Sequence, residues 1–282
     1  MKRAIRNIAA LTWSALALAY SPLWAQKPKS PKEQQALLAV QLAKTPDERI
    51  QLIEKVLTDF ADTEFKVALL QMAVQSEQQK NDFAQTVFYS ERLLKADPNN
   101  VVALVTLATE TARHTRENDL DKDESITKAD KWAKDAIEAA KTMPKPRTDI
   151  PDADWEGYKK DMAAQAYVAM GMDDTLRKNF DGAAENYRKS LEVGSSPNPA
   201  TLVRLAQVYM NSGKLDNADF TLDKAINTPN VPEQVKNVAT SLKSDIAKRK
   251  AAAAAKAGAP PAAAATPANP SPGTAPAPPG NQ

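Results

Sequence analysis

The sequence offers few residues that could do chemistry. His114 is the only histidine among 282 residues, and there is no cysteine. No metalloprotease (HExxH), nucleophile-elbow (GxSxG) or phosphate-binding-loop pattern is present. A general base would need a partner placed beside it, whereas a histidine at the end of an expected helix is common, because it complements the negative end of the helix dipole. The sequence therefore favours a protein without a catalytic site or a cofactor.

An acidic insertion at residues 115–125 is the sharpest local feature. Its spacing is similar to that of a calcium loop, in which oxygen ligands surround a hard cation. The candidate ligands, at the first, third, fifth and twelfth positions, are Asp119, Asp121, Asp123 and Asp130. The match is partial, because Glu124 stands where such a loop needs glycine. The alternative is a solvated acidic loop in which Asp123 or Ser125 caps the next helix.

Residues 1–25 have the layout of a secretory signal peptide. Three cations precede an apolar run over residues 8–20, with cleavage expected after Ala25. The run is too short to span a membrane comfortably. An uncleaved anchor is the alternative, because Leu23 is large for the third position before the cut. We expect an exported protein, periplasmic rather than extracellular, with no integral membrane segment after cleavage.

The charge balance argues against nucleic acid as a partner. The chain has 37 basic and 35 acidic residues, and removing Lys2, Arg3 and Arg6 with the signal leaves 37 − 3 = 34 basic residues. Basic and acidic side chains are interspersed, so no long basic run offsets this balance. Nucleic-acid binding needs a concentrated positive surface, so we expect no nucleic-acid partner.

Residues 251–282, here called the C-terminal tail, consist mostly of Ala and Pro. Each proline removes a backbone donor and clashes with the preceding turn of a helix. The eight prolines are Pro260, Pro261, Pro267, Pro270, Pro272, Pro276, Pro278 and Pro279. No side chain here could build a core, so we expect a disordered, semi-extended tail. It would be either a plain spacer or a Pro-rich ligand.

Between a short linker at 26–32 and the tail, residues 33–250 read as one helical region. Apolar residues recur at helical spacing and strand signals are absent. The clearest unit, Pro199 to Pro232, has two apolar helices joined by a turn at 211–214. At the N-terminal side, Thr45 followed by Pro46 predicts a helix start.

The same unit recurs along the chain. Val67 to Val101 spans 101 − 67 = 34 residues, and Ala183 to Ala218 spans 218 − 183 = 35. Second helices begin at equivalent positions occupied by Phe83, Phe180 and Leu215. A second equivalent position, where two helices should cross, holds the small residues Thr86, Ala129, Ala183 and Ala218.

This period, with small residues at the crossings and a proline closing the unit, resembles the tetratricopeptide repeat. The resemblance covers roughly residues 31–250. It implies an all-α, right-handed α-solenoid of stacked antiparallel helix pairs, about four to five pairs with a capping helix from Pro232 to Lys250. The tryptophan position of the family holds Leu70, Leu104 and Leu202 instead.

The resemblance also implies that the first helices line a concave groove for an extended peptide or a helix of a partner protein. The groove positions carried onto these units are Gln71, Gln75, Gln78, Val105, Thr109, Arg113, Val203, Gln207, Met210 and Asn211. This surface is rich in amides, which can satisfy a peptide backbone without demanding a charged ligand. Of the cations that some family members use to hold an acidic C-terminus, only Arg113 and Arg204 lie near the required positions.

These observations favour a non-catalytic scaffold or adaptor of the bacterial cell envelope. Its expected ligand is an uncharged, extended segment of another envelope protein, held in the groove. Two alternatives stay open. One is a self-associating structural array, a homo-oligomer whose tail acts as a spacer, and the other is a calcium-binding module built on residues 119–130.

Overall fold

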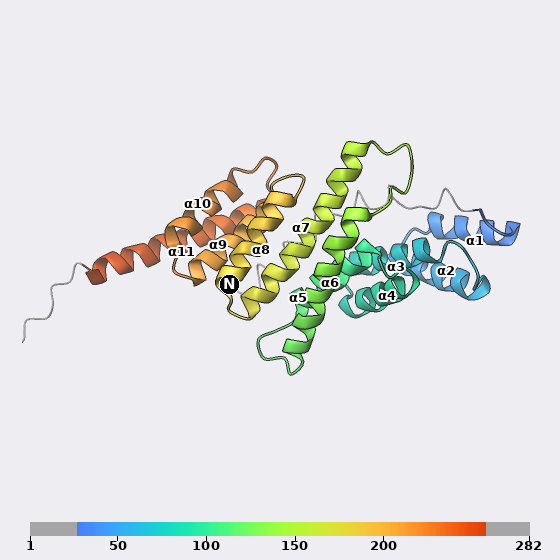
Figure 1. Ribbon diagram of the computed structural model, residues 1–282, viewed down its shortest axis with the longest axis horizontal. Coiled ribbons are helices and arrows are strands. Elements are labelled where there is room, and N and C mark those ends of the chain that lie inside the picture. The colour runs from blue at the N-terminus through green and yellow to red at the C-terminus, as the bar shows by residue number, and fades with distance from the viewer. Residues whose placement is uncertain (1–26, 258–282) are drawn as a thin grey trace, which may run out of the picture.

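The computed structural model describes residues 27–257, which form an elongated, all-helical array (Figure 1). Within these residues there are eleven α-helices and no strand. The expected signal peptide, residues 1–25, lies outside the described residues, as do residues 258–282 of the C-terminal tail. No helix in the described range is long and apolar enough to cross a membrane.

The helices are arranged as five antiparallel pairs followed by one more helix (Figure 1). The first helices of the pairs are α1 (Pro31–Leu42), α3 (Lys66–Lys80), α5 (Val101–His114), α7 (Asp152–Leu176) and α9 (Pro199–Asn211). The second helices are α2 (Pro46–Asp59), α4 (Phe83–Ala96), α6 (Lys122–Thr142), α8 (Phe180–Val193) and α10 (Leu215–Ile226). The array ends with α11 (Glu233–Ala257). Each second helix packs against the first helix of the following pair, so the pairs stack as an α-solenoid.

Local signals in the sequence set the helix ends. Thr45 accepts a hydrogen bond from the Glu48 amide at 3.1 Å and Pro46 is the first helical residue, which confirms the predicted start of α2. At the turn between α9 and α10, Gly213 has φ +75°, a left-handed conformation that glycine adopts without strain. Asn81 takes the same region after α3, with φ 56°.

Small residues lie where the helices cross, as the repeat predicts. Thr86 is 2% exposed, and Ala129, Ala183 and Ala218 are fully buried. The three second helices that were aligned by sequence begin at Phe83, Phe180 and Leu215. Close backbone approach at these points lets the larger apolar side chains fill the space between neighbouring pairs, which stabilises the stack through burial of apolar surface.

The middle of the array departs from a regular repeat. Helix α6 has 21 residues and α7 has 25, and both are longer than the other first and second helices. Helix α7 also packs against α5 as well as against α6 and α8. Trp155 and Tyr158, both buried, stack with ring centroids 5.2 Å apart near the start of α7. The extra turns therefore enlarge the core that joins the two halves of the array.

The last helix, α11, covers the exposed end of the final pair. Val235, Leu242 and Ile246 are buried against it, as expected for a capping helix. The helix continues through Ala257, past the boundary expected at Lys250, because residues 251–257 contain helix-favouring alanines and the first proline is Pro260. In Figure 1 this end of α11 projects beyond the rest of the array.

Candidate functional site

The predicted groove positions all lie on first helices. In α3, Gln71 and Gln75 are partly buried and Gln78 is exposed. In α9, Gln207 is partly buried and Asn211 is exposed. Both helices therefore present amide groups that solvent can reach, with enough packing around their stems to restrict their conformations.

Two predicted groove residues in α9 belong to the core instead. Val203 is 1% exposed and Met210 is 6% exposed, and both pack in the cluster that includes Leu222 and Ile246. On α5, Val105 is 4% exposed and also lies in a core cluster. Their apolar side chains are buried by the neighbouring helices, so they are unavailable to a ligand and the prediction is wrong for these positions.

Polar side chains in the last two turns of α5 are held by their own helix. The Thr109 hydroxyl donates to the Val105 carbonyl oxygen at 2.8 Å. Arg113 forms an ion pair with Glu110 at 2.9 Å. His114 lies with Nδ1 3.0 Å from the Glu110 carbonyl oxygen, and its ring stacks on Phe83 with centroids 3.9 Å apart. These contacts give His114 a structural role at the end of α5.

The positive charge of Arg113 on α5 acts on Arg204 in α9. Burial lowers the pKa of Arg204, in α9, below the usual arginine range, and the positive charge of Arg113 on α5 lowers it further. Like charges brought together in a partly buried setting favour an anionic group beside them. The carboxylate of Glu110 already meets Arg113, so this part of the surface carries a small excess of positive charge.

The structure does not assemble the predicted calcium site. The four carboxylates, Asp119, Asp121, Asp123 and Asp130, lie in a loop and along α6, and Asp130 pairs with Arg177 at 2.8 Å. One carboxylate oxygen of Asp119 instead accepts the backbone amide of Arg116 at 2.7 Å. Over residues 27–257, no group of three or more acidic or histidine side chains is placed to hold a metal ion. Because Asp119 and Asp121 precede α6, whereas Asp130 lies within that helix and pairs with Arg177, this structure does not bring the four predicted ligands together.

A buried carboxyl group beside this pair was missed by the sequence analysis. Asp173 in α7 is fully buried. Burial, reinforced by the negative charge of Asp130, raises the pKa of Asp173 to about 8. Asp173 therefore carries a proton near neutral pH, and the Asp130–Arg177 ion pair lies beside it where α6 meets α7.

A crevice between second helices was also missed. It lies between α8 and α10, over α9, and holds about 440 Å³. Three leucines and one tyrosine form its floor, and polar and charged groups form its rim. The lining residues are Arg188, Leu191, Leu202, Leu205, Tyr209, Asp216, Asn217, Phe220, Thr221 and Lys224. No signal in the sequence indicated this surface, because the exposure of Phe220 is known only once the helices are packed.

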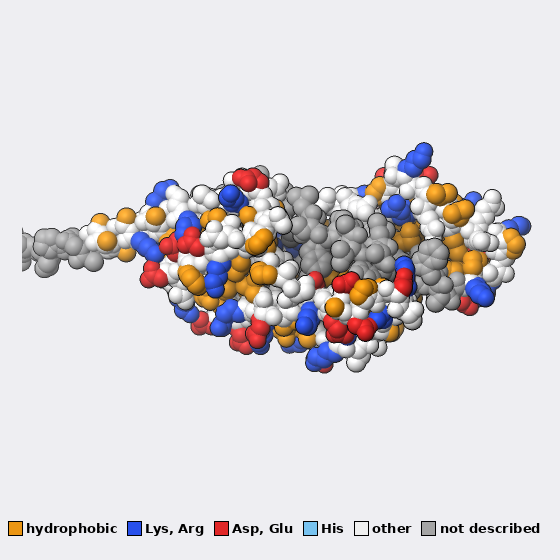
Figure 2. Space-filling view, turned by 90° about the horizontal axis from the view of Figure 1, so that it is seen from above, with side chains coloured by type: hydrophobic (Ala, Val, Ile, Leu, Met, Phe, Trp, Pro, Cys, Tyr) orange, Lys and Arg blue, Asp and Glu red, His pale blue; other side chains and the backbone are white. Residues whose placement is uncertain are grey.

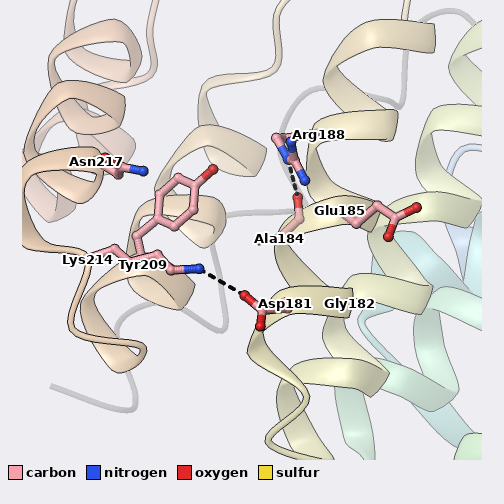
Figure 3. A pocket seen from close by; sticks show the side chains of 8 residues that line it. All are labelled: Asp181, Gly182, Ala184, Glu185, Arg188, Tyr209, Lys214 and Asn217. Atoms are coloured by element: carbon pink, nitrogen blue, oxygen red, sulfur yellow. Dashed lines mark hydrogen bonds and ion pairs between the residues drawn. The ribbon is translucent and has the colours of Figure 1, made fainter.

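A neighbouring pocket of about 420 Å³ is drawn in Figure 3, and it shares Arg188, Tyr209 and Asn217 with the crevice. Tyr209 points into the space between α10, which carries Asn217, and α8, which carries Arg188. An ion pair of 2.9 Å between Lys214 and Asp181 joins the two helices beside this pocket. Elsewhere, charges of both signs are interspersed over the face shown in Figure 2, so the molecule presents no broad field of one sign there.

Comparison with known proteins agrees with the stacked helix pairs. The tetratricopeptide repeat family model matches residues 199–228, which include α9 and α10. The fold is similar to the crystal structure of TTC0263, a thermophilic TPR protein of Thermus thermophilus, with TM-score 0.51 and 19% identity over 74% of this chain and 97% of that one. Yeast Tom70 gives TM-score 0.36 and 15% identity over 78% of this chain and 47% of that one. No curated protein matches the sequence. The chain is thus an α-solenoid that contains a tetratricopeptide repeat and has the fold of a solved TPR protein.

Proposed function

We propose that this chain is a non-catalytic scaffold or adaptor that holds an extended segment of a partner protein along its first helices. The observation that carries the proposal is a set of partly buried amides on first helices, Gln71 and Gln75 on α3 and Gln207 on α9, in a stack of helix pairs. An amide both donates and accepts hydrogen bonds, which suits the backbone of an extended segment. Helical-repeat arrays offer extended surfaces of this kind.

The near absence of charge among these positions limits the kind of segment that this surface can bind. The amide-bearing positions favour a segment that is uncharged over most of its length. The layout of residues 1–25 supports export, so the partner would be another protein of the cell envelope.

The test begins by identifying the partner and then measures its affinity for groove variants. Cross-linking in intact cells followed by mass spectrometry names the candidate, and the purified pair is then titrated. Gln75→Glu and Gln207→Glu should each weaken binding about tenfold, because a carboxylate cannot donate to a backbone carbonyl and repels it. Gln85→Glu is the matched control, since Gln85 is exposed on the second helix α4.

Unchanged affinity in both groove variants, or an equal loss in Gln85→Glu, would rule out the first-helix surface as the binding site. A sedimentation series over protein concentration tests the homo-oligomer alternative. If the chain alone forms a stable oligomer that Gln75→Glu and Gln207→Glu dissociate, the partner is a second copy of this chain rather than another envelope protein.

A further inference from the structure

The crevice between α8 and α10 is a surface separate from the proposed groove. Its walls are the second helices α8 and α10, and although α9 lies beneath them, none of the predicted groove residues lines it. Its floor is apolar and includes the buried side chains of Leu202 and Leu205. Its rim carries three side chains that can donate hydrogen bonds, Arg188, Asn217 and Lys224, and one carboxylate, Asp216, that pairs with Lys250. An apolar floor with donors at the rim suits an uncharged segment whose carbonyl groups face outward.

Two aromatic rings, those of Phe220 and Tyr209, line this crevice. Phe220 on α10 is 62% exposed and lies at the edge of the apolar floor, where it extends the apolar surface of the crevice. Lys224 lies over its ring, with Nζ 4.5 Å from the centroid. Tyr209 projects from α9 between the two walls (Figure 3). Grooves lined by aromatic rings are the surfaces on which Pro-rich, polyproline II segments dock.

Residues 258–282 of the same chain form a proline-rich segment. This segment contains no charged side chain and eight prolines. The PxxP spacing that polyproline II recognition uses occurs twice, at Pro267–Pro270 and at Pro276–Pro279. Proline fixes φ near −65°, so such a segment loses little conformational entropy when it binds.

The place where the described chain ends puts this segment within reach of the crevice. Lys250 near the end of α11 pairs with Asp216, a crevice residue, at 2.7 Å. Helix α11 runs on to Ala257, about 10 Å further at 1.5 Å per residue. The remaining 282 − 257 = 25 residues extend about 75 Å as polyproline II. The linker that matters runs from Ala257 to Pro267, 267 − 257 = 10 residues or about 31 Å as polyproline II, which exceeds the roughly 10 Å back along α11 to Lys250.

We propose that residues 267–279 of this chain bind in its own α8–α10 crevice as a polyproline II segment, with prolines against Tyr209 and Phe220. The apolar floor takes the proline rings, and the rim donates to the carbonyl groups. The C-terminal tail is then an intramolecular ligand that covers this crevice. The proposal is independent of the first-helix groove, so each can fail without the other.

Paramagnetic relaxation in the full mature chain tests this proposal. Because the chain has no cysteine, Ser271→Cys gives a single position for a nitroxide label between the two PxxP motifs. The amide signals of residues 181–193 and 214–224 should lose most of their intensity, while those of α1 to α4 should not. The loss should disappear in Phe220→Ser and persist in Phe88→Ser. Phe88 is a matched control, being 48% exposed on a second helix with a cation, Arg92, 5.4 Å from its ring centroid.

A second variant shows whether any effect of Phe220→Ser comes from a folding defect. Replacing Pro267, Pro270, Pro276 and Pro279 by serine alters the tail alone, and it should also abolish the intensity loss. Uniform weak attenuation, attenuation elsewhere, or persistence in either variant would overturn the proposal. A mixed sample of isotope-labelled chain and spin-labelled, unenriched chain completes the test. An equal intensity loss there would place the tail of a second copy in the crevice and overturn the intramolecular assignment.

Discussion

Asp173, in α7, is a completely buried carboxyl group, and its protonation is coupled to folding. Its pKa is raised to about 8 by burial and by the negative charge of Asp130, whereas an aspartate in an unfolded chain has a pKa near 3.9. Between these two values the folded chain binds a proton that the unfolded chain does not. The free energy of unfolding should therefore fall as pH rises from about 4 to about 8, and level off above that.

Asp173→Asn should remove this pH dependence, because asparagine is neutral throughout. The variant should exceed the wild-type chain in stability at pH 9 by an amount on the order of a few kcal/mol, and should lose that advantage at pH 4. Urea unfolding at several pH values measures the difference. Asp154→Asn, at an exposed position on the same helix, should leave the pH profile unchanged. A parallel profile for Asp173→Asn would show that Asp173 is ionised in the folded chain.

Single residues were predictable where their neighbours in sequence decide their role. Thr45 as a helix cap depends on residues three places away, and the structure confirms it. The role of Asp130 depends on Arg177, 47 residues later, so local spacing made it resemble a calcium ligand. In the same way, helical periodicity put Val203 on the groove face without revealing that the helices packed beside it bury it.

At the scale of the element, α7 contains two glycines in opposite situations. A Cβ atom added at Gly171 would lie 2.6 Å from the ring of Tyr187, which is 2% exposed and belongs to the core. A Cβ atom at Gly157 would meet only Ser195, at 3.7 Å, an ordinary contact. The close approach of α7 and α8 therefore requires glycine at one position and tolerates a side chain at the other.

Gly171→Ala should destabilise the chain although alanine favours helix. The propensity gain is about 1 kcal/mol, and the displacement of a packed tyrosine ring costs roughly 1–3 kcal/mol or more. Gly157→Ala should raise the free energy of unfolding by roughly 0.5–1 kcal/mol, because only the propensity gain applies. Denaturant unfolding of both variants measures the change in the free energy of unfolding, which should be negative for Gly171→Ala and positive for Gly157→Ala. Stabilisation by Gly171→Ala would contradict the close packing of α7 on Tyr187.

Helix starts and the repeat period were readable from sequence, because caps, prolines and small crossing residues are local signals. Phe83, Phe180 and Leu215 each begin a second helix as aligned. The extra length of α6 and α7 was not readable in detail, since the insertion before α6 disturbs the register. The continuation of α11 beyond Lys250 follows from the helix propensity of the alanines at 251–255, a local signal that the expected boundary at Lys250 left out.

Across the whole molecule, the stack presents different surfaces from its first and its second helices. The first helices carry the amides of the proposed groove, and the second helices α8 and α10 enclose the crevice. The fold class followed from the repeat, because each helix pair must bury its apolar face against the next. The crevice could not be predicted, because it depends on how far apart two non-consecutive helices lie.

In the proposed function, a single partner segment lies along the first helices. Site-specific photo-cross-linking tests the position of this segment most directly. A photoreactive amino acid replaces Gln75 on α3, Gln207 on α9 or, as a control, Gln85 on α4. The partner peptides that become cross-linked are then sequenced. We predict that Gln75 and Gln207 attach to neighbouring stretches of one continuous partner segment and that Gln85 does not. Attachment from Gln85 alone, or to unrelated partner surfaces from Gln75 and Gln207, would contradict the claim.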